Sequence, residues 1–507
     1  MVFWPPMAMG ETMSLQKSAP IDASYADSAL EPRSAALQPA AAMGVGEAAG
    51  RTAVKTPAAA PADAARIAIL TGPILPTLLK QALPTMTVLL AQTAVNVAEA
   101  YYVGFLGTDA LAGVALVFPV FMLMMMMSGG GLGSGVASAV ARAVGAGHRH
   151  DADALVLHAL ILSVIVGAIF TVGIIWGGPA LYRALGGRND ALDAALKYSN
   201  YLFAGAIPVW IANLLSAALR GAGNVKIPAL ITLIGAVVLI PFSPILIFGF
   251  GPFPKLGIAG AGIAFALYYG AATLVLLYYM TTGRSGLTLK LTSLERRLFA
   301  DILRVGLPTA LSTILTNLTV ILVTGAFGLF GTTALAACGI TSRLDYVMIP
   351  LLFGVCAAVL TMVGVNVGAG QLARAKQIAW ISAFVGAGIA GTIGVTVAIF
   401  PMLWLRLFSH DAQVLAIGAT YLRIVAPAYA ALGLGFVIAF AAQGAGHVLW
   451  PFVGAASRLV LAAGCGWIAV SYYGAGVAAL AAMVSASLVA YAMINATAMA
   501  SGAVWRK

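Results

Sequence analysis

Long apolar segments, separated by short polar stretches, follow one another from about residue 82 to residue 500. Most are at least about 20 residues long, the length a helix needs to cross the ~30 Å hydrocarbon core of a bilayer. Lipid cannot satisfy free backbone groups, so such segments predict helices. Twelve are expected, at approximately 82–104, 111–141, 154–176, 196–219, 228–250, 256–280, 306–328, 333–367, 377–402, 414–442, 450–470 and 475–500.

Composition supports this interpretation and excludes several others. The chain has 507 residues, of which 61% are hydrophobic and 8% charged, whereas a soluble protein carries about 25% charged residues. The net charge of +11 is spread over the loops, so we expect no nucleic-acid partner. The three cysteines lie in apolar segments without metal or redox spacing. Residues 1–68 are rich in Ala, Pro and Ser, which predicts a disordered tail and not a signal peptide.

Positive residues are divided unevenly between the two sets of loops, and this predicts the orientation. With a cytoplasmic N-terminus, the outer loops hold only Arg183, Arg188, Lys197, Lys255 and Arg406. The inner positions hold Arg142, Arg149, Arg220, Lys226, Arg284, Lys290, Arg296, Arg297, Arg304, Arg374, Lys376, Arg506 and Lys507. We therefore expect a multi-pass protein of the inner or plasma membrane with both termini in the cytoplasm.

The two halves of the chain repeat. FLGTDALAG at 105–113 matches LFGTTALAA at 329–337, and RGAGNVKIP at 220–228 matches QGAGHVLWP at 443–451. The duplicated unit holds six helices, so the repeats are parallel and predict two pseudo-symmetric lobes that alternate access by rocking, as in a transporter. The alternatives are a duplicated scaffold or an intramembrane enzyme. The expected parts are the tail 1–68, a lobe at 69–280, a linker at 281–301, a lobe at 302–501 and an end at 502–507.

Glu99 is the one acid in the first apolar segment. Gln92, Asn96 and Glu99 are spaced by four and three, so they form a polar stripe on one face of a helix. Polar groups are costly in lipid, so this stripe should face the lobe interior. A carboxylate can serve antiport because it holds either a proton or a cation. Counted from Pro84 at ~1.5 Å per residue, however, Glu99 lies about 22 Å along the helix, where snorkelling to the surface is the alternative.

The chain resembles the multidrug and toxic compound extrusion (MATE) transporters. The resemblance covers about residues 70–500 and rests on VAEAYYVGFLGTDALAGV, ARAVGAG, ALRGAGNVKIP, PILIFGFGPFPKLGIAGAG and SRLDYVMIPLLFG. It implies an antiporter, not an enzyme, that exports amphipathic and cationic organic compounds in exchange for protons or sodium ions. It implies no cofactor beyond the ion gradient. We expect a monomer in the lipid bilayer.

The resemblance also assigns Glu99 a role. MATE proteins typically carry Asp as a cation-coupling residue at the position that Glu99 matches. Members with a well-defined cation site often add Asn and Asp on the fifth helix, where this chain has Leu239 and Ser243. The internal repeat pairs Glu99 with Val323, so the carboxylate belongs to one lobe. A single carboxylate with few neutral oxygens favours a proton over sodium.

Further residues are candidates for the transport pathway. Asp345 is a second candidate coupling site or a member of a structural ion pair. Arg343, Arg423 and Arg458 lie inside predicted helices of the second half, where each snorkels, pairs or lines a cavity. The predicted cavity residues are Gln92, Asn96, Tyr101, Tyr102, Trp210, Asn213, Ser243 and Arg343. A sodium-coupled antiporter and a flippase for lipid-linked precursors, whose pyrophosphate these arginines would neutralise, are the alternative functions.

Overall fold

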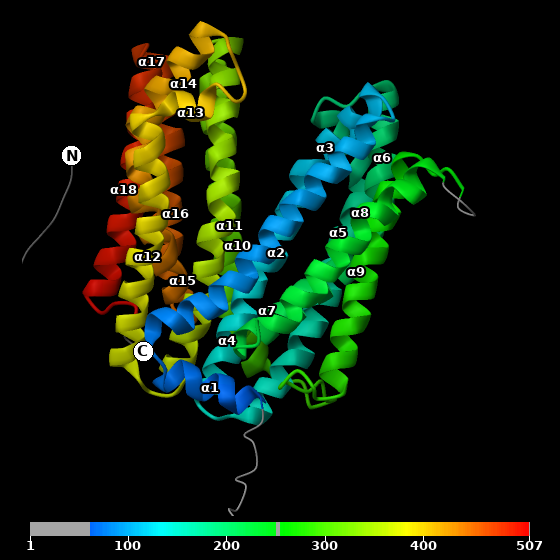
Figure 1. Ribbon diagram of the computed structural model, residues 1–507, viewed down its shortest axis with the longest axis vertical. Coiled ribbons are helices and arrows are strands. Elements are labelled where there is room, and N and C mark those ends of the chain that lie inside the picture. Colours follow the sequence, from blue (N-terminus) through cyan, green and yellow to red (C-terminus); the bar gives the residue numbers. More distant parts are fainter. Residues whose placement is uncertain (1–60, 250–253, 506–507) are drawn as a thin grey trace, which may run out of the picture. The chain divides into compact units, whose positions relative to one another are not determined.

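The computed structural model describes residues 61–249 and 254–505, except for the side chains of 61–63, 345 and 346. All secondary structure in the described residues is helical (Figure 1). The first half contains α1 (Pro61–Thr71), α2 (Ile74–Gly104), α3 (Thr108–Met126), η1 (Met127–Leu132), α4 (Gly133–Gly145), α5 (Arg149–Ala184), α6 (Asn189–Ala204), α7 (Ala206–Gly221), α8 (Lys226–Phe248) and α9 (Ile258–Thr281).

The second half repeats this order with further breaks. It contains α10 (Arg296–Gly328), α11 (Thr332–Gly368), α12 (Leu372–Ile399), α13 (Pro401–Leu405), α14 (Ala412–Val425), η2 (Ala426–Ala428), α15 (Tyr429–Ala445), α16 (Leu449–Arg458), η3 (Leu459–Cys465), α17 (Gly466–Tyr473) and α18 (Val477–Ala500).

The described residues confirm the all-α membrane fold. Eleven helices are long and apolar enough to cross a membrane, and the pair α6 and α7, bent by 48°, makes a twelfth span. The bend falls at Gly205, where an added Cβ would lie 2.7 Å from the Cβ of Ala266 in α9. Pro208 follows in the first turn of α7 and has no N–H for the helical ladder.

Two helices begin before the expected ends of the tail and of the linker. The tail was expected to reach residue 68, but α1 begins at Pro61, because Ile69 on this helix is buried against other helices and stabilises it. Residues 1–60 lie outside the described residues. The linker was expected to end at 301, but α10 begins at Arg296, because Leu298 and Ile302 are buried in the core of the first lobe.

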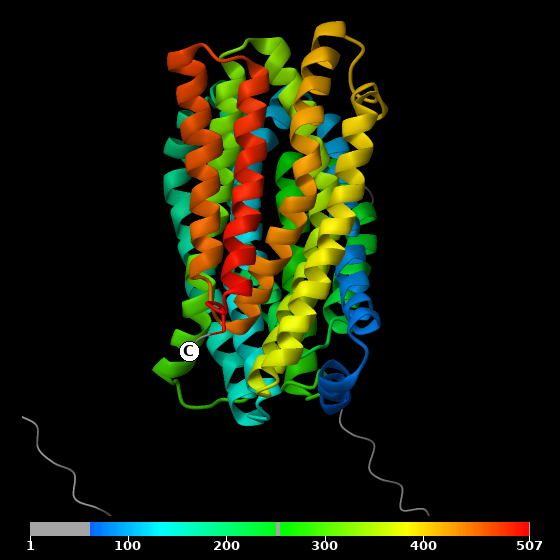
Figure 2. The same ribbon diagram turned by 90° about the vertical axis from the view of Figure 1, so that its left-hand side faces the viewer.

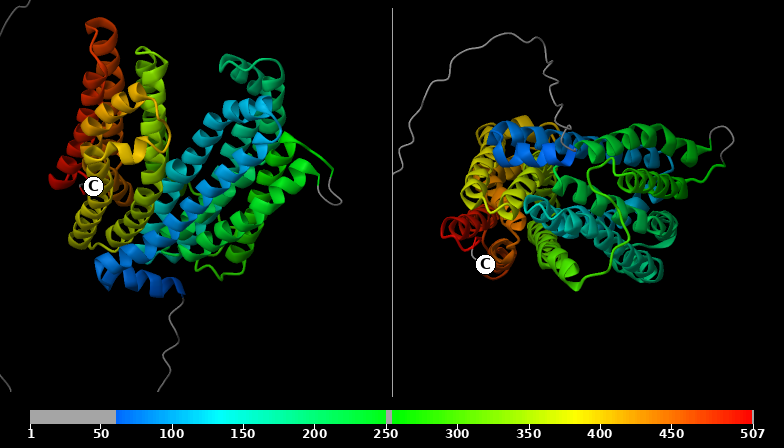
Figure 3. Two further views of the ribbon diagram at one scale, coloured as in Figure 1. Left: turned by 45° about the horizontal axis from the view of Figure 1, so that its top comes forward. Right: turned by 90° about the horizontal axis from the view of Figure 1, so that it is seen from below.

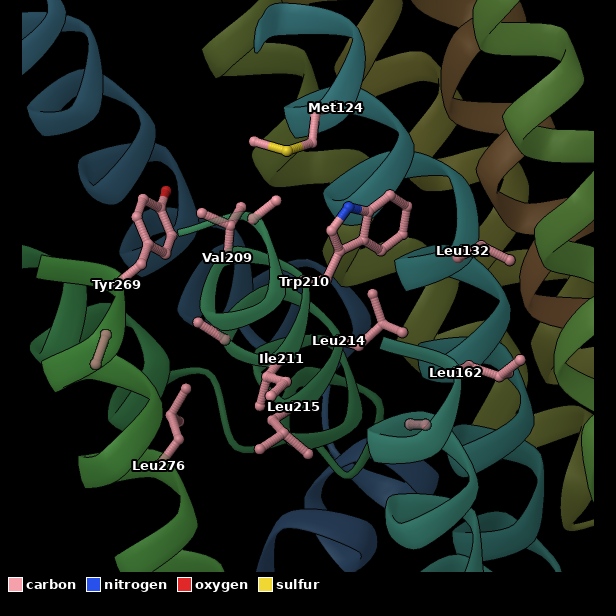
Figure 4. Packing of buried hydrophobic residues seen from close by; sticks show 14 of the residues in the cluster. Met124, Leu132, Leu162, Val209, Trp210, Ile211, Leu214, Leu215, Tyr269 and Leu276 are labelled. Atoms are coloured by element: carbon pink, nitrogen blue, oxygen red, sulfur yellow. The ribbon is translucent and has the colours of Figure 1, made fainter. Parts of the chain in front are cut away.

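The spans form two bundles, α2–α9 and α10–α18 (Figures 1 and 2). Buried side chains such as Leu214 and Leu215 fill the first bundle (Figure 4). The connections α4–α5, α7–α8, α9–α10, α11–α12 and α15–α16 all lie at one end, which we call the basic end. Helix α1 also lies there, beside helices of both lobes (Figure 3). Arg66 on α1 donates to the Gly145 carbonyl of one lobe, while Asn366 of the other donates to the Ile69 carbonyl.

Each lobe begins with a helix that packs partly on the other lobe. Leu78 and Ala82 of α2 are buried with Val355 and Val359 of α11. Leu298 and Ile302 of α10 are buried in the cluster of the first lobe. The half of α2 that is farther from the basic end instead packs against α8 of its own lobe. Val95 and Leu239 lie there in one buried cluster. The two lobes are therefore interlocked at the basic end through their first helices.

The sequence VGAG occurs at 144–147 and again at 367–370, and the first glycine of each copy closely approaches the backbone of the other lobe. A Cβ on Gly145 would overlap the carbonyl oxygen of Val365, and a Cβ on Gly368 would overlap that of Arg142. Residues 142 and 365, and likewise 145 and 368, are equivalent in the repeat, so this contact follows the pseudo-symmetry. Thr361 adds a hydrogen bond of 3.0 Å to the Arg220 carbonyl.

Both lobes interrupt the equivalent helices, but by different means. A π-helical turn, η1, occupies MSGGGL in the second span. Its counterpart in the repeat is the part of α11 that begins at Pro350. The π-helical η3 in the second lobe corresponds in turn to the part of α8 that contains Pro241. Such interruptions allow a spanning helix to change direction in the membrane.

Candidate functional site

Helix α2 presents one face to the second lobe and another to its own lobe. At the basic end Met86 contacts the position of Gly354 on α11. The same face continues through Leu90, Val97 and Tyr101, whose exposed fractions of 50%, 65% and 65% show that they touch no partner helix closely. At about 100° per residue, Gln92 and Glu99 point about 120–140° away from Met86 and still further from the other residues of this face. The polar stripe therefore lies toward the interior of the first lobe, as predicted.

Glu99 projects between α2, α6 and α8. The Ser243 hydroxyl on α8 donates a hydrogen bond of 3.3 Å to its Oε1. Tyr198 on α6, which is buried, interacts electrostatically with the carboxylate. Among the described residues no basic nitrogen forms an ion pair with Glu99 within 4.0 Å. The carboxylate of the half-buried Glu99 is therefore directed at a hydroxyl of its own lobe.

Gln92 occupies a second polar position about two turns nearer the basic end. Its Nε2 donates a hydrogen bond of 2.9 Å to the Tyr269 hydroxyl on α9. That hydroxyl lies 3.8 Å from the Met125 sulfur on α3. Figure 4 shows Tyr269 directed from its helix into the first lobe. Glu99 and Gln92 at the two ends of the stripe on α2 thus bond to polar groups of α8 and α9, respectively. Asn96, which lies between them on α2, is half-buried.

The structure separates the predicted cavity residues. Trp210 is completely buried and packs against Phe170 (Figure 4). It belongs to the packed core, where we predicted a cavity wall, because α7 turns this face into the bundle. Asn213 donates a hydrogen bond of 2.8 Å to Ser128 in η1 and links α7 to that interruption.

The tyrosine pair after Glu99 is also divided. Tyr101 lies on the exposed face of α2 that is directed at the second lobe, with its ring edge-on to Phe105 at a centroid distance of 5.0 Å. Tyr102 is partly buried against the core of the first lobe. Only Tyr101 is therefore available to a molecule between the lobes.

The arginine candidates belong to the second lobe. Arg343 is exposed on α11, with its guanidinium carbon 5.1 Å from the centre of the Phe408 ring. Arg423 is exposed on α14. Arg458 is half-buried and lies over the Tyr491 ring of α18 at 5.7 Å. The side chain of Asp345 lies outside the described residues, so its predicted role stays a prediction.

Sequence reasoning missed two partners of the stripe, Tyr198 and Tyr269. Each is a phenol in an apolar helix, but tyrosines are common at membrane boundaries, and the spacing alone could not pair them with α2. It also treated Ser243 mainly as a missing acid, whereas this hydroxyl is a hydrogen-bond partner of Glu99. Leu239, one turn earlier, is buried among apolar side chains as its residue type predicts.

Comparisons with known proteins agree with this architecture. The MatE family matches residues 84–245 and 308–468, the two halves of the repeat. The chain belongs to the MATE family of membrane transporters.

Among curated proteins, the chain is 28% identical to the FAD transporter of Shewanella oneidensis over 406 residues, which cover 78% of this chain and 88% of that protein. It is also 28% identical to the probable multidrug resistance protein YoeA of Bacillus subtilis, over 69% of this chain and 76% of that protein.

Solved structures with the same fold include a MOP superfamily transporter from Pyrococcus furiosus described as having a binding pocket of reverse polarity. Its TM-score is 0.79 at 25% identity, over 87% of this chain and 99% of that one. A MATE structure in the straight conformation has a TM-score of 0.77 at 25% identity, over 86% of this chain and 98% of that one.

Proposed function

We propose that this transporter exports amphipathic organic compounds in exchange for protons, and that Glu99 carries the proton. The observation that supports the proposal is the setting of Glu99: it faces the lobe interior, accepts a hydrogen bond from Ser243 and has no ion-pair partner among the described residues. Desolvation of this kind favours the protonated form of a carboxyl group. A proton is then released when the substrate or the second state of the lobes stabilises the charge.

The surroundings of Glu99 support a proton more than a sodium ion. Hard cations need several oxygen ligands in the protein, and here the described partners are the Ser243 hydroxyl and the phenol of Tyr198. Leu239 contributes no oxygen. Burial, followed by the charges of Arg304 and Arg142, lowers the pKa of His447 in the α15–α16 connection.

The test is transport by the reconstituted protein under separate gradients. Vesicles are loaded with ethidium, with riboflavin or with riboflavin 5′-phosphate, and an inward proton gradient or an inward sodium gradient is imposed. We expect export with the proton gradient alone. Glu99→Gln should lower proton-driven export to the level of protein-free vesicles, because the amide cannot exchange a proton in this range.

Asp109→Asn is the matched control, since Asp109 is an exposed acid in the first turn of α3. It should transport as the parent does. Export that follows the sodium gradient, or a fully active Glu99→Gln variant, would refute the proton mechanism.

The proposal of an amphipathic substrate is supported by the faces that the two lobes turn toward each other and by the names of the relatives. Those faces expose both apolar and polar side chains, which suits an amphipathic compound, and the relatives include multidrug resistance proteins and an FAD transporter. The charge of the substrate is either positive, as the sequence resemblance implies, or negative.

We further propose that the protein is a monomer in the inner or plasma membrane. The distribution of positive residues favours an orientation with the basic end in the cytoplasm. The start of α1 and the end of α18 lie at that end. A cysteine introduced at Arg284 in the α9–α10 connection should react with an impermeant maleimide only after the membrane is opened. Labelling of this cysteine in intact cells would contradict this orientation and favour the opposite one.

A further inference from the structure

The face of α11 that carries Arg343 is the face that meets the first lobe. Gly354, Thr361 and Gly368 lie on α11 at the basic end and contact Met86, the Arg220 carbonyl and Arg142 of the first lobe. At about 100° per residue, Arg343 is within about 20° of Gly354, Thr361 and Gly368 around the helix axis. By this count Arg343 continues the face of α11 that meets the first lobe, about three turns beyond Gly354.

The guanidinium of Arg343 is exposed and held by a ring. Its carbon atom lies 5.1 Å from the centre of the Phe408 ring, a cation–π contact that does not require its N–H donors. Among the described residues it forms no ion pair within 4.0 Å. The five donors of its planar fork are therefore not taken up by an ion pair among the described residues.

Charged side chains are rare on the faces of α2, α10 and α11 that the two lobes turn toward each other. The exposed positions of α2 toward the second lobe include Leu90, Thr93, Val97 and Tyr101. On α10, Asn317 contacts the Met126 sulfur of the first lobe at 3.9 Å, and Thr313, Val320 and Thr324 lie on the same face. In the described parts of these faces on α2, α10 and α11, Arg343 is the one charged side chain.

We propose that Arg343 binds an oxyanion of the transported substrate, and that the substrate is an aromatic or apolar compound with a phosphate or carboxylate group. The proposal rests on the transport function inferred above and replaces the cationic substrate implied by the resemblance. An oxyanion pairs with the guanidinium fork through two parallel hydrogen bonds. The exposed apolar wall of α2, with the Tyr101 ring, receives the apolar body. A cation at this level would be repelled by Arg343.

The experiment compares ligands that differ only in the anionic group. Riboflavin 5′-phosphate and riboflavin share one ring system, and ethidium serves as an aromatic cation. Binding to the purified protein in detergent is measured by fluorescence polarisation at low salt. We expect the phosphate form to bind about ten-fold more tightly than riboflavin, which corresponds to ~1.4 kcal/mol, and the difference to shrink as salt is added.

Variants assign this preference to the residue. Arg343→Gln should bind the two flavins equally while its affinity for riboflavin stays unchanged, and Arg343→Lys should keep part of the preference. Arg183→Gln, at an exposed arginine near the end of α5, is the matched control and should behave as the parent. Should Arg343→Gln fail to fold, the lysine variant and the salt series of the parent carry the comparison.

Three results would overturn the proposal: equal binding of the two flavins by the parent, preferential binding of ethidium, or an unchanged phosphate preference in Arg343→Gln. Binding in detergent requires no ion gradient, so its outcome is independent of proton coupling. If Glu99→Gln abolishes proton-driven export while the phosphate preference is absent, only the assignment of Arg343 fails.

Discussion

Glu99 acquires its proposed role from the side of α2 on which it lies. A shift of one residue along the helix would direct it toward the second lobe, beside Val97 and Tyr101, instead of toward Ser243. The spacing of Gln92, Asn96 and Glu99 was sufficient to predict this face. The partners on α6 and α9 were not predictable, because they come from segments about 100 and 170 residues away whose packing no local pattern encodes.

Ion preference at this site should depend on the number of oxygens around Glu99. The double substitution Leu239→Asn and Ser243→Asp places on α8 the amide and carboxylate that relatives with a well-defined cation site often have. Hard cations require several such ligands, so we expect the double variant to gain sodium-driven export that the parent lacks. Leu239→Ala with Ser243→Ala, which adds no oxygen, is the control and should gain none. Sodium-driven export by the control, or none by the double variant, would show that oxygen count does not set the preference.

At the scale of elements, close helix contacts join the lobes at the basic end. VGAG recurs in the two halves of the sequence, but a sequence repeat gives equivalence and no distance, so it could not predict that each copy contacts the other lobe. Gly145 and Gly368 have no side chain, and this allows backbone to approach backbone across the interface. At equivalent places in the repeat, one lobe uses a π-helical turn where the other uses proline.

Gly145→Val should open the basic end. Overpacking costs about 1–3 kcal/mol, which corresponds to roughly a 5- to 150-fold change in an equilibrium constant. In a background without the three native cysteines, Thr361→Cys lies buried at the interface. We expect a water-soluble maleimide to label it faster by that range when Gly145→Val is present.

The control for this prediction is Gly173→Val, because the space around Gly173 on α5 is open. It should leave the labelling rate unchanged. Equal rates in Gly145→Val and the parent would mean that the glycine contact does not hold the lobes together at this end.

At the scale of the whole molecule, two similar lobes have acquired different chemistry. The first contains Glu99, whose counterpart Val323 is buried among apolar residues in the second. The second contains Arg343, whose counterpart in the repeat falls at Pro119 or Val120. The twelve-helix fold and the duplication followed from hydrophobic pattern and self-similarity. The different chemistry of the two lobes could not be predicted from the sequence, because it depends on which helix faces the two lobes turn toward each other.

Glu99 is proposed to carry the exchanged proton, and the change in protein-bound protons on substrate binding tests this most directly. Purified protein in weakly buffered solution with a pH dye is mixed with riboflavin 5′-phosphate and, separately, with ethidium. For each compound that binds, we expect the parent and Asp109→Asn to change the number of bound protons, with release for a cation and uptake for an anion, and Glu99→Gln to show no change. Binding by the parent with no change in bound protons, or an equal change in Glu99→Gln, would contradict the proton mechanism.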